Sequence, residues 1–427
     1  MLIYNAIICT PEGRLSGYVV TENGVISKVS GGSPTLQEQD AHRTCAVDAG
    51  GAWLLPGAID AHVHFREPGL THKATIASES AAALAGGVTS FMDMPNTVPP
   101  TVSVEAWEEK MRLAERSSVA NYAFFIGATA DNMNQLRRAD YSRIPGIKLF
   151  MGSSTGRMAV GDERALAEIF ETAQVPVVVH AEDDAVIALN RARIEAFAGK
   201  DPEVYYHSII RDSLACVKAT EHAMELAQRY GTRLHIAHVS TAEELSLLSP
   251  GPVEGKLITA EVSPHHLMFC TDDYKERGAR IKMNPSVKSE RDRQALRQGV
   301  LSGRIDIVAT DHAPHLLTEK EGGALKAVSG APMVQFSTAV TAGLFGPETV
   351  SQVMSSKVRE VFAIRERGCI APGYKADMML MEQVPEGYTV TDADVLSKCG
   401  WTPLAGVRLY WRVKQTFITG PEPLLFR

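Results

Sequence analysis

Four histidines, one aspartate and one lysine carry the chemistry that this sequence suggests. His62 and His64 stand two residues apart at the end of an apolar run, so in a regular strand their side chains point to the same face. Other apolar runs carry or precede the remaining members of the set, which are Lys148, His180, His238 and Asp311. Imidazole and carboxylate groups are the ligands that suit zinc and similar divalent ions. Together these residues predict a metal site.

Each of these residues taken alone has a simpler explanation. A single buried histidine is usually a hydrogen-bonded core residue, and a single lysine often lies at the surface or contacts a phosphate. Independent core histidines have no reason to gather at strand ends, and this favours the metal site. Lys148 is the unusual member, because an ammonium group has no lone pair to donate to a metal. Carboxylation by carbon dioxide would turn it into an anionic carbamate that could bridge two ions.

The elements that must position these residues can be read from Trp53 onward, where apolar runs alternate with stretches of helical period. Eight runs stand out: Leu54–Ala61, Val88–Met94, Ala120–Gly127, Gly146–Met151, Val175–Ala181, Arg233–Val239, Leu257–Val262 and Ile305–Thr310. The clearest helix candidates between them are Thr71–Ala85, Val104–Arg116, Asp162–Ala173, Asp212–Tyr230 and Ser289–Ser302. This α/β alternation predicts parallel strands closed into a (β/α)8 TIM-type barrel, whose active site lies at the C-terminal ends of the strands.

Short β-like runs also lie near both ends of the chain. They are Leu2–Cys9, Ser16–Thr21, Val25–Val29, Asp377–Glu382, Val407–Trp411 and Gln415–Thr419. We therefore expect one small sheet domain from residues 1–52 plus 365–427, beside a barrel of residues 53–364. An open doubly wound sheet is the alternative, but no G-x-G-x-x-G motif follows an early strand.

Composition excludes several classes of protein. The 427 residues are 45% hydrophobic and 22% charged, and the net charge of −7 is spread without a basic block. Binding to nucleic acid or to a membrane surface is therefore not expected. Six scattered cysteines without a C-x-x-C pair fit reduced thiols. Because no signal peptide or membrane-spanning run is visible, we expect a cytoplasmic protein.

Three motifs resemble those of the amidohydrolase superfamily and, more narrowly, of its dihydroorotase family. They are HVHFREPG at His62–Gly69, DMPNT at Asp93–Thr97 and TDHAPH from Thr310. The tail segments APGYKADMML and SKCGWTPLAG are also similar, so the resemblance covers nearly the whole chain. It implies a (β/α)8 barrel with a small β-sandwich domain formed from both chain termini, in agreement with the strand count.

The resemblance also implies a set of ligands for two zinc ions. These are His62, His64 and Asp311 for one ion, His180 and His238 for the other, and carboxylated Lys148 with a hydroxide as bridges between them. The segment GIKLFMG around Lys148 is similar to the branch of the family that uses a modified lysine. Another branch uses an aspartate a few residues downstream, where this chain has Gly152, Ser153 and Ser154.

The function implied by the resemblance is the reversible cyclisation of N-carbamoyl-L-aspartate to L-dihydroorotate in pyrimidine biosynthesis. The bridging hydroxide would attack the ring amide, and Asp311 would pass its proton to the leaving nitrogen. The substrate-binding residues implied by the resemblance are Arg66, Asn96, Asn284 and His315. We also expect a homodimer, with association with aspartate transcarbamoylase as an option.

Two alternatives stay open. Another cyclic amidohydrolase, such as a dihydropyrimidinase (hydantoinase) or an allantoinase, would share the metal ligands, although Arg66 with Asn96 favours a substrate that carries a carboxylate. A non-catalytic scaffold that resembles dihydroorotase is the second alternative. Such a chain would be expected to lose ligands, and here all the candidates are present.

Overall fold

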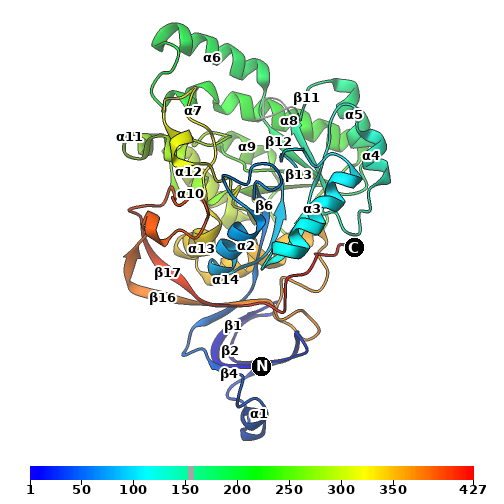
Figure 1. The fold of residues 1–427 in the computed structure, drawn as a ribbon, viewed down its shortest axis with the longest axis vertical. Helices are drawn as coiled ribbons and strands as arrows, with labels where there is room; N and C mark the ends of the chain where they lie inside the picture. Colours follow the sequence, from blue (N-terminus) through cyan, green and yellow to red (C-terminus); the bar gives the residue numbers. More distant parts are fainter. Residues whose placement is uncertain (152–157) are drawn as a thin grey trace.

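The computed structural model describes residues 1–151 and 158–427 of the chain. Gly152, Ser153 and Ser154, the positions that bear on the aspartate branch of the family, lie outside the described residues. Within the described ranges the strands form three hydrogen-bonded sheets. In Figure 1 the larger body, with its helices, occupies the upper part of the view, and a sheet made from both ends of the chain lies below it.

Two parallel sheets form the centre of the larger body. Their strands are β6 (Ala58–Val63), β7 (Val88–Asp93), β8 (Asn121–Phe124), β9 (Ile126–Gly127), β10 (Ile147–Met151), β11 (Ala159–Val160), β12 (Val177–Ala181), β13 (Leu234–Ile236), β14 (Ile258–Val262) and β15 (Ile307–Val308). One sheet has the order β6-β7-β8 and the other β11-β10-β12-β13-β14-β15, with β9 paired to β10. Every predicted run contains a strand, and the predicted parallel pairing is confirmed.

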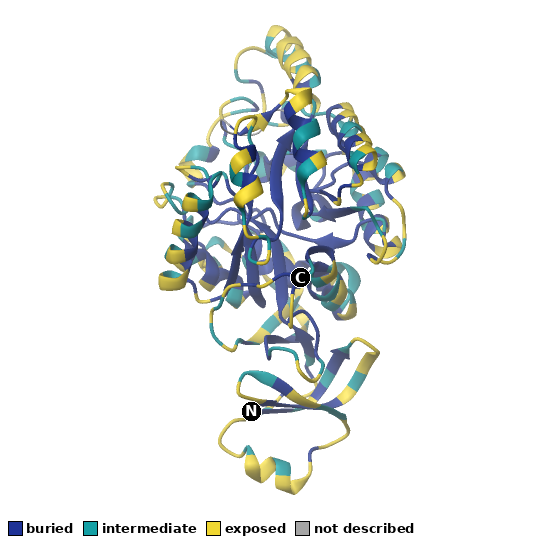
Figure 2. Cartoon of the chain, turned by 90° about the vertical axis from the view of Figure 1, so that its right-hand side faces the viewer, coloured by how far each residue is buried: buried dark blue, intermediate teal, exposed yellow. Residues whose placement is uncertain are grey.

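Helices follow these strands, as the alternating pattern predicts. They are α2 (Ile76–Ala85), α3 (Val104–Ser117), α4 (Met133–Arg138), α5 (Glu163–Thr172), α6 (Asp184–Ala198), α7 (Tyr206–Ile210), α8 (Ser213–Tyr230), α9 (Ala242–Leu247), α10 (Pro264–Met268), α11 (Tyr274–Arg277), α12 (Glu290–Ser302), α13 (Ser337–Phe345), α14 (Pro347–Ser351) and α15 (Lys357–Phe362). Figure 2 shows the strands buried and the outer faces of the helices exposed. This α/β organisation with parallel sheets fits a TIM-barrel-type fold.

The predicted helix starts are mostly correct because short polar side chains cap the backbone. Asp162 Oδ1 accepts a hydrogen bond from Ala165 N at 2.8 Å, and Ser289 caps α12 in the same way. The predicted start of α2 at Thr71 is too early. Thr75 is the cap, and its hydroxyl accepts from Ser78 N at 3.1 Å, so the helix begins one residue later at Ile76.

Both ends of the chain contribute to one seven-stranded sheet. Its strands are β1 (Leu2–Thr10), β2 (Gly13–Glu22), β3 (Val25–Gly31), β4 (Ala46–Asp48), β5 (Trp53–Pro56), β16 (Met378–Thr389) and β17 (Arg408–Phe417). The order is β17-β16-β5-β1-β2-β3, with β4 paired to β1; a short helix, α1 (Leu36–Ala41), precedes β4. The predicted run Leu54–Ala61 is divided: β5 pairs with β16, whereas β6 pairs with β7. At Gly57, between them, an added Cβ would lie 2.2 Å from Thr89 Oγ1, so only glycine permits this close crossing.

The segments that follow the first strand, β6, and the last strand, β15, are hydrogen-bonded to each other beside the candidate ligands. His64 N donates to His312 O at 2.7 Å, and Val63 forms a parallel bridge with His312. Two residues before His62, the buried Asp60 accepts hydrogen bonds from His62 N at 3.2 Å and from Thr310 N at 3.0 Å. These bonds fix two ligand-bearing segments side by side. None of the helices in the described part of the chain has both the length and the apolar character needed to cross a bilayer.

Candidate active site

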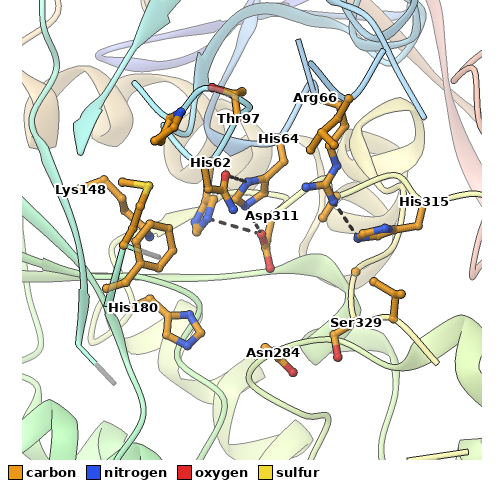
Figure 3. A pocket seen from close by; sticks show the side chains of 18 of the residues that line it. His62, His64, Arg66, Thr97, Lys148, His180, Asn284, Asp311, His315 and Ser329 are labelled. Atoms are coloured by element: carbon orange, nitrogen blue, oxygen red, sulfur yellow. Dashed lines mark hydrogen bonds and ion pairs between the residues drawn. The ribbon is translucent and has the colours of Figure 1, made fainter. Parts of the chain in front are cut away.

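A cavity of about 640 Å³ opens at the C-terminal ends of the parallel strands. All the candidate site residues predicted from the sequence line it: His62, His64, Arg66, Asn96, Lys148, His180, His238, Asn284, Asp311 and His315. Figure 3 shows how most of their side chains converge from different strands. His265 and His266, interpreted from the sequence as structural, are buried and do not belong to the lining. The structure therefore brings the predicted residues together, while their roles remain predictions.

His62, His64 and Asp311 form a compact group of potential metal ligands. His64 Nε2 lies 3.0 Å from Asp311 Oδ1, and His62 Nε2 lies 3.4 Å from the same oxygen. One ligand atom from each of the three residues lies within 4.8 Å of the others, and all three side chains are buried. Two imidazoles and a carboxylate around one point suit a divalent cation. This observation supports a metal-dependent enzyme.

His180 and His238 face each other on the other side of His62. His180 Nδ1 lies 2.9 Å from His238 Nε2, and the ring of His238 lies 5.3 Å from the ring of His62 between centroids. Burial lowers the pKa of His180 and holds the pKa of His238 well below its ordinary value. Both imidazoles are therefore neutral near pH 7, with ring nitrogens that can coordinate a metal.

Lys148 lies in β10 beside these histidines and is fully buried. Its Nζ has no hydrogen-bond partner among the described residues and lies 5.1 Å from the ring centroid of Phe150. Burial lowers the pKa of Lys148 to about 8, although Glu261 and Asp311 oppose the shift. A buried ammonium without a partner is costly, and burial therefore favours the neutral amine.

An unusual backbone conformation helps to orient the side chains of three site residues. Arg66, His238 and Asp311 have φ values of 68°, 39° and 47°, in the left-handed region that non-glycine residues rarely adopt. Each lies just after a strand end, where the chain would otherwise continue straight. Such conformations cost of order 1–3 kcal/mol each and persist where the surrounding structure holds them.

Glu261, in β14, contacts the candidate ligands but was not singled out by the sequence analysis. Its Oε1 contacts the Nδ1 atom of His62 and also accepts from His238 N at 3.2 Å. Its Oε2 lies 3.1 Å from His235 Nε2. One buried carboxylate thus orients members of both histidine groups and leaves His62 Nε2 facing Asp311. The available signal was a charged residue inside the apolar run Leu257–Val262.

Glu182 performs a similar task for His180. Its Oε2 lies 2.9 Å from His180 Nε2 and also contacts Arg211 Nη1. The ring nitrogen left for a metal is therefore Nδ1, the one that faces His238. The sequence signal was the spacing of two residues from His180, which places both side chains on one face of an extended segment.

The far side of the cavity from Lys148 carries cationic and amide groups. Arg66 Nε donates to Pro314 O at 3.0 Å, and Arg66 Nη2 lies 2.9 Å from His315 Nε2. Asn96 Oδ1 lies 2.7 Å from His64 Nδ1, so this amide also orients a candidate ligand. Asn284 Oδ1 is buried at the cavity without a partner among the described residues. These groups can bind an anionic, hydrogen-bonding ligand next to the histidines.

Comparisons with known proteins identify the family of the chain. The amidohydrolase family pattern matches residues 53–420. Proteins named dihydroorotase are similar over most of the chain. One from Methanosarcina acetivorans is 34% identical (91% of this chain, 84% of the relative), one from Halobacterium salinarum 36% (83% and 82%), and one from Pyrococcus furiosus 32% (95% and 88%). The chain therefore belongs to the amidohydrolase family.

Similar solved structures fit the TIM-barrel-type fold. The L-hydantoinase (dihydropyrimidinase) of Arthrobacter aurescens superposes with a TM-score of 0.88 at 24% identity, covering 99% of this chain and 96% of that one. The dihydropyrimidinase of Brevibacillus agri also gives a TM-score of 0.88, at 23% identity, with 100% and 95% covered. At this identity the likeness concerns the fold alone, and substrate choice depends on the cavity itself.

Proposed function

We propose that this protein catalyses the dihydroorotase reaction, the reversible cyclisation of N-carbamoyl-L-aspartate to L-dihydroorotate. The observation that carries the proposal is the position of Arg66 and His315. Arg66 Nη2 lies 2.9 Å from His315 Nε2, in the same cavity as His62, His64 and Asp311. Dihydroorotate has a carboxylate on a cyclic amide, and this cavity offers a site for each of the two groups. The relatives named dihydroorotase support the same choice.

The donor set fits two metal ions, and we propose zinc for both. His62, His64 and Asp311 would hold one ion, and His180 with His238 would hold the other. The unpartnered Nζ of Lys148 supports carboxylation, because a neutral amine can add carbon dioxide and the carbamate would then bridge the ions. When bound, such ions lower the pKa of a water molecule and polarise an amide carbonyl.

Asp311 would carry the proton between the two reacting atoms. Burial alone would raise its pKa, but His62 and His64 hold the pKa of Asp311 well below its ordinary value. The carboxylate is therefore ionised and can accept a proton. In hydrolysis, water adds to the ring carbonyl, Asp311 takes the proton from the water, and it gives this proton to the nitrogen as the carbon–nitrogen bond breaks. Cyclisation is the reverse sequence.

Arg66, Asn96 and His315 would hold the ring carboxylate. The guanidinium of Arg66 is anchored by Pro314 O through Nε and keeps its terminal nitrogens for an anion. Asn284, whose Oδ1 has no partner among the described residues, would accept a hydrogen bond from a ring N–H. These contacts would fix the amide carbonyl beside the histidines, and positioning of this kind is a large part of catalysis.

We propose that the two parallel sheets close into a single (β/α)8 barrel. The segment at residues 121–127 pairs with β7 through β8 and with β10 through β9, and the Val63–His312 bridge links the remaining edges. We also propose that residues 1–52 and 365–427 form a separate β-sandwich domain beside the barrel of residues 53–364. The shared core of the terminal sheet, which includes Ile8, Val19, Met378 and Phe417, supports this division. Strand β5 belongs to the same sheet, so the sheet extends to Pro56, four residues past the proposed boundary.

Homodimer formation, association with aspartate transcarbamoylase and a cytoplasmic location stay predictions. The six cysteines are free, which fits reducing surroundings.

The deciding experiment is a hydrolysis assay of purified protein with dihydroorotate, dihydrouracil, hydantoin and allantoin in parallel. We expect turnover of dihydroorotate, complete loss after removal of metal by a chelator, and recovery with zinc. Metal analysis should find two zinc ions per chain. Preference for a neutral ring would instead establish a dihydropyrimidinase or an allantoinase, and a protein without zinc or turnover would establish the scaffold.

A further inference from the structure

His315 lies between two cationic side chains, one at each ring nitrogen. Arg66 Nη2 is 2.9 Å from His315 Nε2, and Lys73 Nζ is 3.0 Å from His315 Nδ1. The imidazole is buried, and Trp401 Nε1 donates to His315 O at 2.7 Å, which fixes the backbone at this position. Figure 3 shows the contact of His315 with Arg66 at the cavity. Lys73 also belongs to the cavity lining.

This arrangement has more donors than acceptors. A guanidinium and an ammonium can only donate, and a neutral imidazole has one N–H and one acceptor nitrogen. Burial, with Arg66 and Lys73, lowers the pKa of His315, so the ring is neutral. One of its two cationic neighbours therefore donates to the ring, and the other faces a ring N–H.

The position of Glu319 indicates which neighbour donates. Glu319 Oε1 lies 2.6 Å from Lys73 Nζ and holds the ammonium against Nδ1. Glu319 Oε2 is 3.7 Å from His315 Nδ1, which is too long for a hydrogen bond. Lys73 is thus the bound donor, whereas Arg66 Nη2 faces the cavity, where a ligand atom can enter.

We propose that Lys73 is a positioning residue that sets the tautomer of His315. By donating to Nδ1, Lys73 places the ring proton on Nε2, on the side of Arg66. Two N–H donors then point toward one place in the cavity, and the two oxygens of a carboxylate can accept from both. The pair is complementary to an anion before any substrate arrives, and preorganisation of this kind lowers the cost of binding.

The substrate class follows, although this consequence rests on the proposed function. A ring with a carboxylate gains both hydrogen bonds and relieves the donor–donor contact. A neutral ring, such as dihydrouracil or hydantoin, gains neither and leaves the two donors facing each other. Lys73 therefore determines specificity for an anionic ring without touching the reacting amide.

The tautomer can be measured directly on the zinc-loaded, substrate-free protein. Long-range proton–nitrogen correlation spectra of ¹⁵N-histidine-labelled protein distinguish protonated from unprotonated ring nitrogens, and His315→Gln identifies the signals of His315. We expect a proton on Nε2 in the wild type. In Lys73→Met we expect the proton on Nδ1, because Nδ1 no longer accepts from an ammonium and Nε2 can then accept from Arg66. Lys73→Arg should keep the wild-type pattern.

A proton on Nδ1 in the wild type would overturn the proposal even if Lys73→Met failed to fold. An unchanged tautomer in a folded Lys73→Met would also overturn it. Lys326→Met, at an exposed lysine, is the matched control and should leave the signals of His315 unchanged.

Kinetics supply a second readout. In Lys73→Met we expect the KM for dihydroorotate to rise about tenfold or more while kcat stays within about threefold, the pattern of lost ground-state binding. A fall in kcat without a change in KM would overturn the positioning role. If the wild type does not turn over dihydroorotate at all, the proposed function fails, and the tautomer measurement still decides the role of Lys73.

Discussion

The Nε2 atom of His64 lies 3.0 Å from Oδ1 of Asp311, although the two residues are 247 positions apart in the sequence. The same oxygen lies 3.4 Å from His62 Nε2. One carboxylate oxygen is thus shared by two imidazoles, and the second oxygen of Asp311 remains for another task. In the proposed mechanism, this division would allow a single side chain to take part in both metal binding and proton transfer.

Replacement of Asp311 tests the proton transfer. We expect Asp311→Asn to retain its fold, measured by circular dichroism, and to lose about 10²–10⁴-fold in kcat for dihydroorotate hydrolysis, because an amide cannot accept the proton. Zinc content should be measured in the same sample, since the substitution also weakens one ligand. Asp40→Asn, at an exposed position, is the control. Near wild-type kcat in Asp311→Asn would refute the role.

The carboxylate of Glu261 should matter for metal binding without touching the metal. Glu261→Gln keeps the shape of the side chain but removes the charge that orients His62 and binds His238 N. We expect zinc affinity to fall about 10–100-fold, the usual effect of losing a carboxylate partner of a ligating histidine. Competition with a chelating dye would measure it. Glu254→Gln is the exposed control, and equal affinity in both variants would contradict the prediction.

Arg66 should affect substrate binding and leave the metal alone. In Arg66→Ala we expect the KM for dihydroorotate to rise at least about tenfold, because the carboxylate loses a bidentate donor. Arg66→Lys should recover little, since an ammonium cannot reproduce the planar fork. Zinc content, measured by atomic absorption, should equal that of the wild type. Loss of zinc would show that this arginine, two residues from His64, is needed mainly for structure.

Stability should depend on pH through buried neutral histidines. Burial lowers the pKa of His266 from 6.5 to about 4 and holds the pKa of His207 well below 6.5. The unfolded chain binds these protons as the pH falls below about 6.5, whereas the folded chain excludes them. The free energy of unfolding is therefore fully retained above pH 6.5 and falls toward pH 4, by up to about 1.4 kcal/mol per pH unit for each group.

Urea denaturation of the metal-free protein at several pH values would measure this loss. His266→Gln can keep the hydrogen bond to Pro285 O but cannot titrate, so its stability should fall less steeply between the same two pH values. An identical slope in the variant and the wild type would show that His266 contributes nothing to the pH dependence.

Much of the architecture was predictable because it depends on local patterns. Apolar runs separated by helical periods give parallel strands in sequence order, and polar caps such as Asp162 and Ser289 mark helix starts. The candidate ligands were also predictable. Metal chemistry restricts the residue types, and the C-terminal ends of parallel strands lie at the same edge of the sheet. Less predictable was the division of Leu54–Ala61 between two sheets, since pairing partners more than 300 residues away decide it.

By itself the sequence determined which side chains can bind a metal and that strands followed by helices carry them. Only the tertiary structure decided which nitrogen of His62 and of His64 faces the cavity, because Glu261 and Asn96 make that choice through contacts between separate segments of the chain. The same holds for Lys73 beside His315. Hydrogen-bond geometry depends on distances of a few tenths of an ångström, and residue order alone does not contain them.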